Sequence, residues 1–258
     1  MPFLRPESEE IVAMYEFERT VYHCDAGADA LLKLDSAAAM LMDCCQFQEY
    51  SEVKFREWLE RNQTAVFLSA LQLDLLRKPA FREKIRVRVV IYDCKSIYGF
   101  RRITMRGENN ELLMIANGIG CFFNFATGKA VKLPENIEDY LTLDSAADDP
   151  MEVLPRKILQ PAGEGIALEP FKVMRSDLDL NRHLTTARYF ALAEDRLPED
   201  FRYDRVRVEF KHQVKCGETV QPFLYRENPE TALILLKNSA GLLNALFEFS
   251  TRKHRDGV

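Results

Sequence analysis

The chain has 258 residues, of which 47% are hydrophobic and 29% are charged, and its formal net charge at pH 7 is −5. A chain of this length can bury a real core in one large domain or in two domains of ordinary size. The negative balance argues against a nucleic-acid-binding protein, because such proteins carry an excess of Lys and Arg.

Three local features bear on the cellular setting of the protein. Residues 1–10 contain no apolar segment of the kind found in signal peptides. The longest apolar stretch, residues 112–125, is short for a membrane span and is interrupted by Asn117. The six cysteines form no C-x-x-C pair, which gives no support to a metal or redox motif. We therefore expect a cytoplasmic protein with reduced cysteines, no metal, no cofactor and no membrane insertion.

The first half of the chain predicts a strand, a helical region and several further strands. A strand is expected over residues 10–22, and Asp35-Ser36 gives an N-cap signal for the apolar helix that follows. Helical character resumes over 51–61. The alternation of apolar and polar residues then predicts strands at 65–76, 84–93, 98–106 and 111–125. A short helix is expected to start at Pro134.

The second half repeats this order of elements. Residues 143–165 contain three prolines and few periodic apolar positions, which is typical of a linker. Strands are then expected at 166–174 and 205–216. Residues 225–236 contain an Asn228-Pro229 turn, and residues 239–241 lead to a last strand that ends near residue 252. Residues 21–25 match residues 173–177 at an offset of 152 positions. Two copies of one unit are the simplest account, with domains at 1–142 and 166–258 joined by the linker 143–165.

Residues 173–198 contain the densest group of candidate functional side chains. Polar residues recur there at every second position: Asp177, Asp179, Asn181 and His183. An extended backbone would place them on one side and would turn Leu178, Leu180 and Leu184 towards a core. The pattern thus predicts a polar ribbon held by apolar anchors.

A helix is predicted directly after this ribbon, with Thr185 or Thr186 as its N-cap and Pro198 as its stop. The N–H groups at the start of a helix, and their partial positive charge, suit a developing oxyanion. The sequence would therefore bring a carboxylate, an amide and an imidazole to a helix N-terminus. The alternative is that the same residues form Asx-turns and a helix cap without any chemical role.

The ribbon and helix resemble the R-x-D-L-D-x-N-x-H-x-N-N-x-x-Y signature of the acyl-acyl-carrier-protein (acyl-ACP) thioesterases. The matching residues are Arg175, Asp177, Leu178, Asp179, Asn181, His183 and Tyr189. Weaker similarity covers most of the chain, including Arg101-Arg102 and residues 127–134. The resemblance implies an α+β fold of two tandem hot-dog domains, each a curled antiparallel β-sheet wrapped around a long central α-helix. It also implies hydrolysis of fatty acyl-ACP thioesters.

By this resemblance, Asp179, Asn181 and His183 occupy the family's catalytic positions. Asp179 would orient or charge the site, Asn181 would hold water or the thioester oxygen, and His183 would move the proton. Substrate-binding positions are expected at Thr185, Thr186 and Gln213. The offset of 152 puts other residues at the catalytic positions of the first copy, which is then expected to form a wall of the acyl tunnel: Gly27, Asp29 and Leu31.

Three positions depart from the family pattern. Thr185-Thr186 replaces Asn-Asn, Leu192 replaces an aromatic residue, and Gln213 stands where the family has a Glu. A glutamine can orient water but cannot accept its proton. Loss of a general base there would slow catalysis by about 10²–10⁴-fold. Glu209, four positions earlier, could substitute for it only if the strand bends or bulges.

The functions that stay open share an acyl thioester as ligand. A working acyl-ACP thioesterase is preferred over a catalytically weak acyl-binding protein, an acyl-CoA thioesterase or a hot-dog dehydratase. The absence of a G-x-S-x-G elbow argues against an α/β-hydrolase. The expected floor of the acyl tunnel is one of Met40, Trp58, Phe67 and Phe122.

The expected partner is an acyl carrier protein bearing a fatty acyl-phosphopantetheine. Carrier proteins are acidic, so this net negative chain needs a local basic patch to bind one. Two groups of arginines are candidates: Arg86, Arg88, Arg101, Arg102 and Arg106, or Arg202, Arg205 and Arg207. The chain itself is expected to be a monomer or a homodimer.

Overall fold

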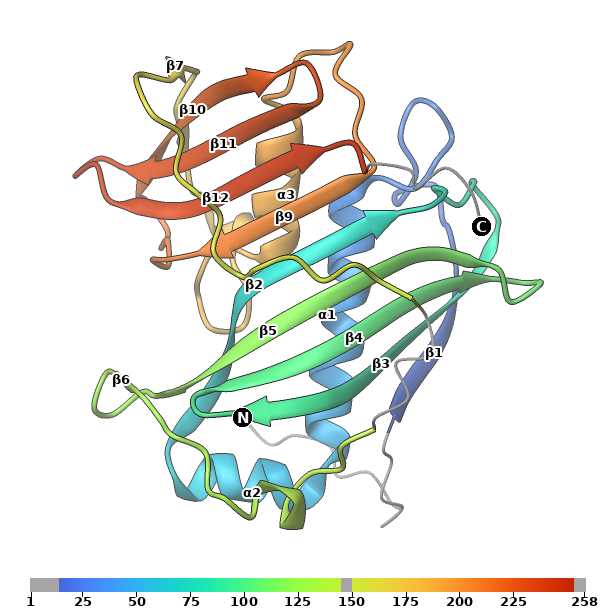
Figure 1. The fold of residues 1–258 in the computed structure, drawn as a ribbon, viewed down its shortest axis with the longest axis vertical. Coiled ribbons are helices and arrows are strands. Elements are labelled where there is room, and N and C mark those ends of the chain that lie inside the picture. Colours follow the sequence, from blue (N-terminus) through green and yellow to red (C-terminus); the bar gives the residue numbers. More distant parts are fainter. Residues whose placement is uncertain (1–13, 145–149, 253–258) are drawn as a thin grey trace.

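The computed structural model describes residues 14–144 and 150–252 (Figure 1). The first half begins with β1 (Met14–Thr20), α1 (Leu34–Ser51) and α2 (Val53–Arg61). Its remaining strands are β2 (Thr64–Leu75), β3 (Lys84–Lys95), β4 (Tyr98–Gly107), β5 (Leu112–Asn124) and β6 (Lys129–Ala130), followed by the 3₁₀ turn η1 (Ile137–Asp139).

The second half repeats the plan with shorter elements. It begins with β7 (Ile166–Ala167), β8 (Phe171–Lys172), the 3₁₀ turn η2 (Arg175–Asp177) and α3 (Thr186–Glu194). It ends with β9 (Arg205–Phe210), β10 (Thr219–Asn228), β11 (Thr231–Asn238) and β12 (Leu243–Ser250). The α3 helix has nine residues, half the length of the 18-residue α1.

All the described strands belong to one antiparallel sheet of 12 strands. Its order is β1-β3-β4-β5-β2-β9-β12-β11-β10-β7, with β6 paired to β5 and β8 paired to β10. The two halves meet where β2 pairs with β9, and α1 and α3 pack together on one face of the curled sheet (Figure 1). Each half is a sheet wrapped around a helix, so the α+β, hot-dog fold expected from the resemblance is confirmed.

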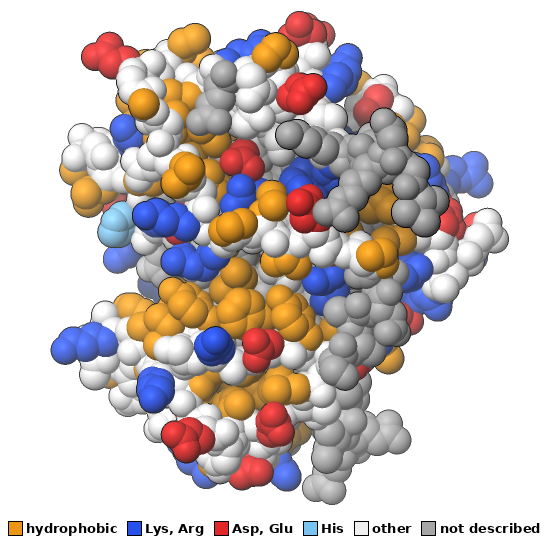
Figure 2. Space-filling model, in the orientation of Figure 1, with side chains coloured by type: hydrophobic (Ala, Val, Ile, Leu, Met, Phe, Trp, Pro, Cys, Tyr) orange, Lys and Arg blue, Asp and Glu red, His pale blue; other side chains and the backbone are white. Residues whose placement is uncertain are grey.

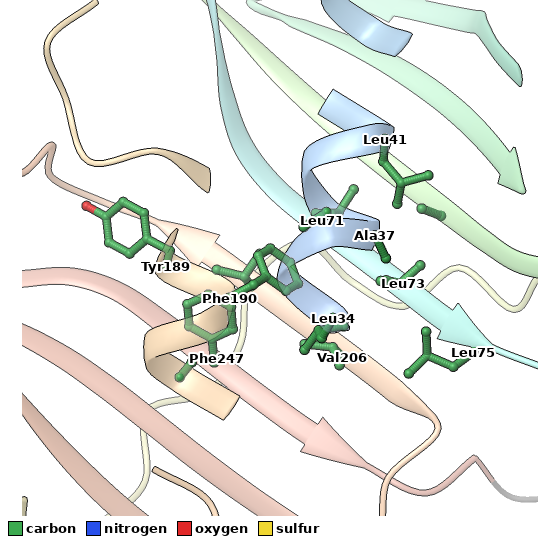
Figure 3. Packing of buried hydrophobic residues seen from close by; sticks show 14 of the residues in the cluster. Leu34, Ala37, Leu41, Leu71, Leu73, Leu75, Tyr189, Phe190, Val206 and Phe247 are labelled. Carbon is green, nitrogen blue, oxygen red and sulfur yellow. The ribbon is translucent and has the colours of Figure 1, made fainter. Parts of the chain in front are cut away.

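The α1 helix packs eight of its 18 residues into the core, while others, such as Asp43 and Gln46, are exposed. Its buried residues are Leu34, Ala37, Ala38, Met40, Leu41, Cys44, Cys45 and Gln48. Figure 3 shows α1 beside α3, and the Phe190 ring of α3 lies 5.1 Å from the Phe247 ring. Burial of each large apolar side chain stabilises the fold by about 1.5–3 kcal/mol. The predicted cap at Asp35-Ser36 is wrong, since Leu34 already lies in the helix and Lys33 precedes it without a side-chain cap.

The inner face of the first half also holds a buried ion pair. Arg101 on β4 binds the Glu49 carboxylate of α1 at 3.0 Å and reaches the Cys45 carbonyl at 3.5 Å. Both charged side chains are largely buried, at 13% and 15% exposure.

Three of the four residues predicted as the floor of the acyl tunnel lie in buried clusters: Met40, Trp58 and Phe122. The fourth, Phe67, lies outside these clusters, and its ring centroid is 6.0 Å from that of Phe123.

Residues 145–149 of the predicted linker lie outside the described residues, and residues 150–165 cross the outer face of the sheet and bind to it at the junction of β2 and β9. Gln72 donates to the Glu152 carbonyl and accepts from Leu154 N, at 2.8 and 2.9 Å. Arg205 bridges Asp74 and Glu152 there, at 2.7 and 3.0 Å. Figure 2 shows charged side chains over this region and hydrophobic side chains gathered below it. The segment therefore fastens the halves together.

Two predicted elements differ from the structure for local reasons. The helix expected at Pro134 is only the three-residue 3₁₀ turn η1, in which the Asn136 side chain donates to Asp139 Oδ2 at 2.7 Å. The strand expected over 205–216 stops at Phe210. There Lys211 N and His212 N both donate to the Asn244 carbonyl, which turns the chain. No helix among the described residues is long and apolar enough to span a membrane.

Candidate active site

The ribbon at residues 177–184 forms a tight turn, so the prediction of an extended backbone is wrong. Asp179 N donates to the His183 carbonyl at 2.8 Å, and Arg182 N donates to the Asp179 carbonyl at 3.0 Å. The turn closes because Leu178 pairs with Leu184, and Arg182 takes a positive φ of 63° to allow the reversal. Leu184 is buried, but Leu180 at the tip is 86% exposed and does not anchor a core.

The Asp179 carboxylate holds the inside of this turn. Its Oδ1 accepts Asn181 N at 2.8 Å and His183 N at 3.0 Å. This arrangement fixes the carboxylate, and it is the Asx-turn that the alternative interpretation expects. The side chains of Asp179 and Asn181 are exposed and that of His183 is half-buried, so the structure brings the three predicted catalytic residues onto one turn.

The first half contains the same turn without these residues. Gly27 N donates to Leu31 O and Ala30 N donates to Gly27 O, at 2.8 and 3.0 Å, and Ala30 has a φ of 60°. Each of these features lies 152 positions before its counterpart in the second half. The predicted repeat thus extends to individual hydrogen bonds. In the first copy the Asp29 carboxylate accepts Leu31 N at 3.0 Å, which is the counterpart of the bond from His183 N to Asp179. A carboxylate therefore holds the turn in both copies, but only the second copy combines it with an amide and an imidazole.

The turn leads directly into α3, as predicted. Thr185 is the N-cap, and its Oγ1 accepts Arg188 N at 3.2 Å. Among the described residues, the N–H groups of Thr186 and Ala187 make no protein hydrogen bond, so they can donate to a ligand. Asp177 pairs with Arg188 at 3.2 Å and ties the preceding 3₁₀ turn to the helix. This is a site at which an oxyanion can be stabilised.

Residues 213–215 run beside the turn and bring a second segment to the site. Leu184 N donates to the Val214 carbonyl at 2.8 Å, and His183 and Lys215 form an antiparallel bridge. The position of this bond makes His183 and Lys215 a non-hydrogen-bonded pair, whose side chains lie close on one face. Gln213 is exposed and precedes this contact, so it lies beside the start of α3. The sequence did not indicate that Lys215 would be a neighbour of His183.

Glu209 does not replace the carboxylate that Gln213 lacks. Its side chain is 1% exposed and accepts Arg156 Nη1 at 3.0 Å, and it also binds Lys211 Nζ and Ile158 N. These partners place it on the outer face, under the linker, whereas Val208 beside it faces the helices. The bend that was needed to redirect Glu209 does not occur before the strand ends.

Tyr189 is a further polar group beneath the turn. It is 4% exposed, and its ring packs edge-on against Phe210 at 5.2 Å. Burial, with smaller contributions from Glu218 and Asp179, raises the pKa of Tyr189. The phenol is therefore neutral near pH 7 and keeps a proton to donate. Tyr189 belongs to the family signature, which is the signal that indicated it in the sequence.

Substitution of Asp179 separates turn formation from catalysis. Asp179→Asn keeps an acceptor for both N–H groups but removes the charge, so we expect a thermal midpoint close to that of the native protein. If the charge orients the site, thioester hydrolysis should fall by about 10²-fold or more. Asp179→Gly removes the acceptor as well as the charge, so it should lower the thermal midpoint in addition to the activity. If Asp179→Asn lost activity and the folded circular dichroism signal to the same extent, the result would indicate that Asp179 has only a structural role.

The structure removes several arginines from the predicted carrier-binding patches. Arg101 lies inside the first half, paired with Glu49. Arg205 is largely buried between Asp74 and Glu152, and Arg207 pairs with Glu248 at 2.8 Å.

A hollow of about 10 Å³ between the linker and the outer face is too small for an acyl chain; its lining includes Gln72, Asn117, Pro155, Arg156 and Arg207.

Comparison with known proteins agrees with the sequence motif. Residues 11–141 match the family described as the acyl-ACP thioesterase N-terminal domain, and residues 163–242 match the acyl-ACP thioesterase C-terminal domain. Comparison with curated proteins finds no match.

Solved structures similar to this chain cover nearly all of it. An acyl-ACP thioesterase from Bacteroides thetaiotaomicron has 16% identity and a TM-score of 0.77, over 92% of this chain and 97% of its own. A 12:0-ACP thioesterase from Umbellularia californica has 12% identity and a TM-score of 0.79, over 95% of this chain and 99% of its own. At such identities the likeness establishes the fold.

Proposed function

The chain belongs to the acyl-ACP thioesterase family, and we propose that it hydrolyses fatty acyl-ACP thioesters at the turn of residues 177–184. One observation carries the choice of site. The same turn occurs twice, and only the copy in the second half bears a carboxylate, an amide and an imidazole in front of a helix N-terminus. The apolar interior of the first half then serves as the wall of the acyl site.

In the proposed mechanism a water oxygen attacks the thioester carbonyl carbon. His183 takes a proton from this water and returns it to the sulfur as the carbon–sulfur bond breaks, which releases fatty acid and carrier thiol. The N–H groups of Thr186 and Ala187 stabilise the oxyanion. Asp179 orients the turn that carries His183, while Asn181 and Gln213 position the water by hydrogen bonds.

Hydrolysis of a panel of acyl-ACPs and acyl-CoAs by the purified protein tests this proposal. We expect free fatty acid from acyl-ACP, with lower kcat/KM on acyl-CoA of the same chain. Equal or better cleavage of acyl-CoA would favour the acyl-CoA thioesterase. Binding of acyl-ACP without release of fatty acid would identify a catalytically weak acyl-binding protein.

The Gln213 position predicts an attenuated rate. Gln213→Glu places a proton acceptor beside the start of α3, so we expect kcat on acyl-ACP to rise by about 10-fold or more. The matched control is Gln160→Glu, which introduces the same charge at an exposed glutamine of the linker, away from the turn. A Gln213→Glu enzyme no faster than the native enzyme would mean that the turn supplies all the required proton transfer.

We propose a setting consistent with this reaction. The protein would act in the cytoplasm, where it would terminate fatty acid synthesis, and it would work as a monomer or a homodimer. Its domains would be residues 1–142 and 166–258, joined by 143–165. The β2–β9 junction already supplies the pairing between two hot-dog sheets.

A further inference from the structure

The surface around the site turn is unusual for a chain with a net charge of −5. Four of its cations are exposed, and none forms an ion pair with another described residue: Lys172, Arg175, Arg182 and Lys215. Residues 171–188 and 214–218 together contain five Lys or Arg and three Asp or Glu. The surface formed by these two segments is therefore locally positive, although the whole chain is acidic.

The fold brings these cations together from separate segments. Lys172 on β8 pairs with Thr219 on β10, and Val173 N donates to the Glu218 carbonyl at 2.9 Å. The bridge between His183 and Lys215 joins the turn to the same segment. The four cations thus lie on neighbouring segments that include the site turn.

The carboxylates in this area are occupied by local contacts. Asp177 pairs with Arg188 and accepts Met174 N, at 3.2 and 2.8 Å. Asp179 holds the turn, and Glu218 accepts Lys215 N at 2.8 Å. These contacts are intramolecular, whereas the four cations make no ion pair with a carboxylate of residues 14–144 or 150–252. An anionic partner would complete their interactions.

Two large apolar side chains are exposed among the cations. Leu180 is 86% exposed at the tip of the turn, and Met174 is 58% exposed just before η2. Both stand on a backbone held by several hydrogen bonds, so their exposure belongs to the fold. Apolar side chains ringed by unpaired cations match a partner surface that has apolar residues among carboxylates.

We propose that Lys172, Met174, Arg175, Leu180, Arg182 and Lys215, the rim patch, form the surface on which the acidic acyl carrier protein docks. This inference rests on the proposed function, because the carrier must deliver its acyl arm to the adjacent turn. The cations steer the acidic carrier, and Leu180 and Met174 make the apolar contact that holds it. The rim patch replaces the arginine groups that the sequence suggested.

The test compares two substrates with the same acyl group, acyl-ACP and S-acyl-N-acetylcysteamine, which lacks the carrier. For Lys172→Glu/Leu180→Ser we expect the ratio of kcat/KM on acyl-ACP to kcat/KM on the surrogate to fall by about 10-fold or more. Added salt should lower kcat/KM of the native enzyme on acyl-ACP more than on the surrogate. The matched control is Lys54→Glu/Leu159→Ser, which changes an exposed cation on α2 and a 78% exposed leucine on the linker, and it should keep the native ratio.

Each outcome bears on one proposal. A native ratio in Lys172→Glu/Leu180→Ser, within about twofold, would overturn the rim patch while leaving thioesterase activity intact. If the native protein cleaves neither substrate, the proposed function fails, and fluorescence anisotropy with labelled acyl-ACP still decides the docking surface. Binding that is about 10-fold weaker in the rim variant than in the control supports it, and equal binding contradicts it.

Discussion

His183→Ala is expected to lower kcat on acyl-ACP by about 10²–10⁴-fold, the usual contribution of a positioned general acid or base. His183 lies on the turn before α3 and forms a backbone bridge with Lys215. It is half-buried, and no described group hydrogen-bonds its imidazole, so its removal should cost little stability. Single-turnover hydrolysis and a thermal melt of the same preparation measure both effects.

His212→Ala is the matched control for this substitution. His212 lies two residues after the end of β9, outside the turn, and its side chain is exposed. We expect its kcat to match that of the native enzyme within about twofold. If His183→Ala retained more than about a tenth of native activity, the proton would have to move through another group, and the assignment of the turn as the reaction site would fail.

Arg101→Met is expected to destabilise the protein by about 3–5 kcal/mol, because it leaves the Glu49 carboxylate unpaired in the interior. Arg101 binds Glu49 at 3.0 Å, and both side chains are largely buried between α1 and the sheet. Equilibrium unfolding in urea measures the loss. The double variant Arg101→Met/Glu49→Leu replaces the pair with apolar groups and should recover most of the stability.

The pH dependence of this variant follows from the carboxyl group. Burial raises the pKa of Glu49 even beside the guanidinium, and loss of Arg101 should raise it further. A raised pKa in the folded state means that stability falls as pH rises above the ordinary value of 4.5 and through the folded value. The loss of unfolding free energy caused by Arg101→Met should therefore be larger at about pH 8 than at about pH 5.

A matched exposed ion pair provides the control. Arg61 and Glu57 pair at 2.9 Å on α2, with exposures of 72% and 51%. Arg61→Met should cost no more than about 0.5 kcal/mol, since exposed helical pairs contribute little. If Arg101→Met lowered the free energy of unfolding as little as Arg61→Met and without dependence on pH, the Glu49 carboxylate would have to be solvated or paired with another group.

Features that depend on local sequence were predicted well. The strands at β3 and β4 follow from apolar alternation, and Thr185 caps α3 because an N-cap needs only its own hydroxyl and a nearby N–H. The repeat at an offset of 152 was also visible, and the structure extends it to matching hydrogen bonds in both turns. These signals lie within a few residues of the groups that they organise.

Two of the wrong predictions concern which way a side chain points. Strict alternation placed Leu180 in a core, but the pairing of Leu178 with Leu184 closes a turn that leaves it exposed. The Arg101-Arg102 pair looked like surface charge, yet one of two adjacent strand residues must face α1, and Glu49 is there to receive it.

The sequence by itself determined the order of the elements, the repeat and the residues that carry the family motif, because period, caps and motif spacing are properties of neighbouring residues. Only the tertiary structure decided that Glu209 is bound under the linker and that Lys215 lies beside His183. The physical reason is that the face of a strand and the neighbours of a turn are set by partners far away in the chain, whose positions follow from packing.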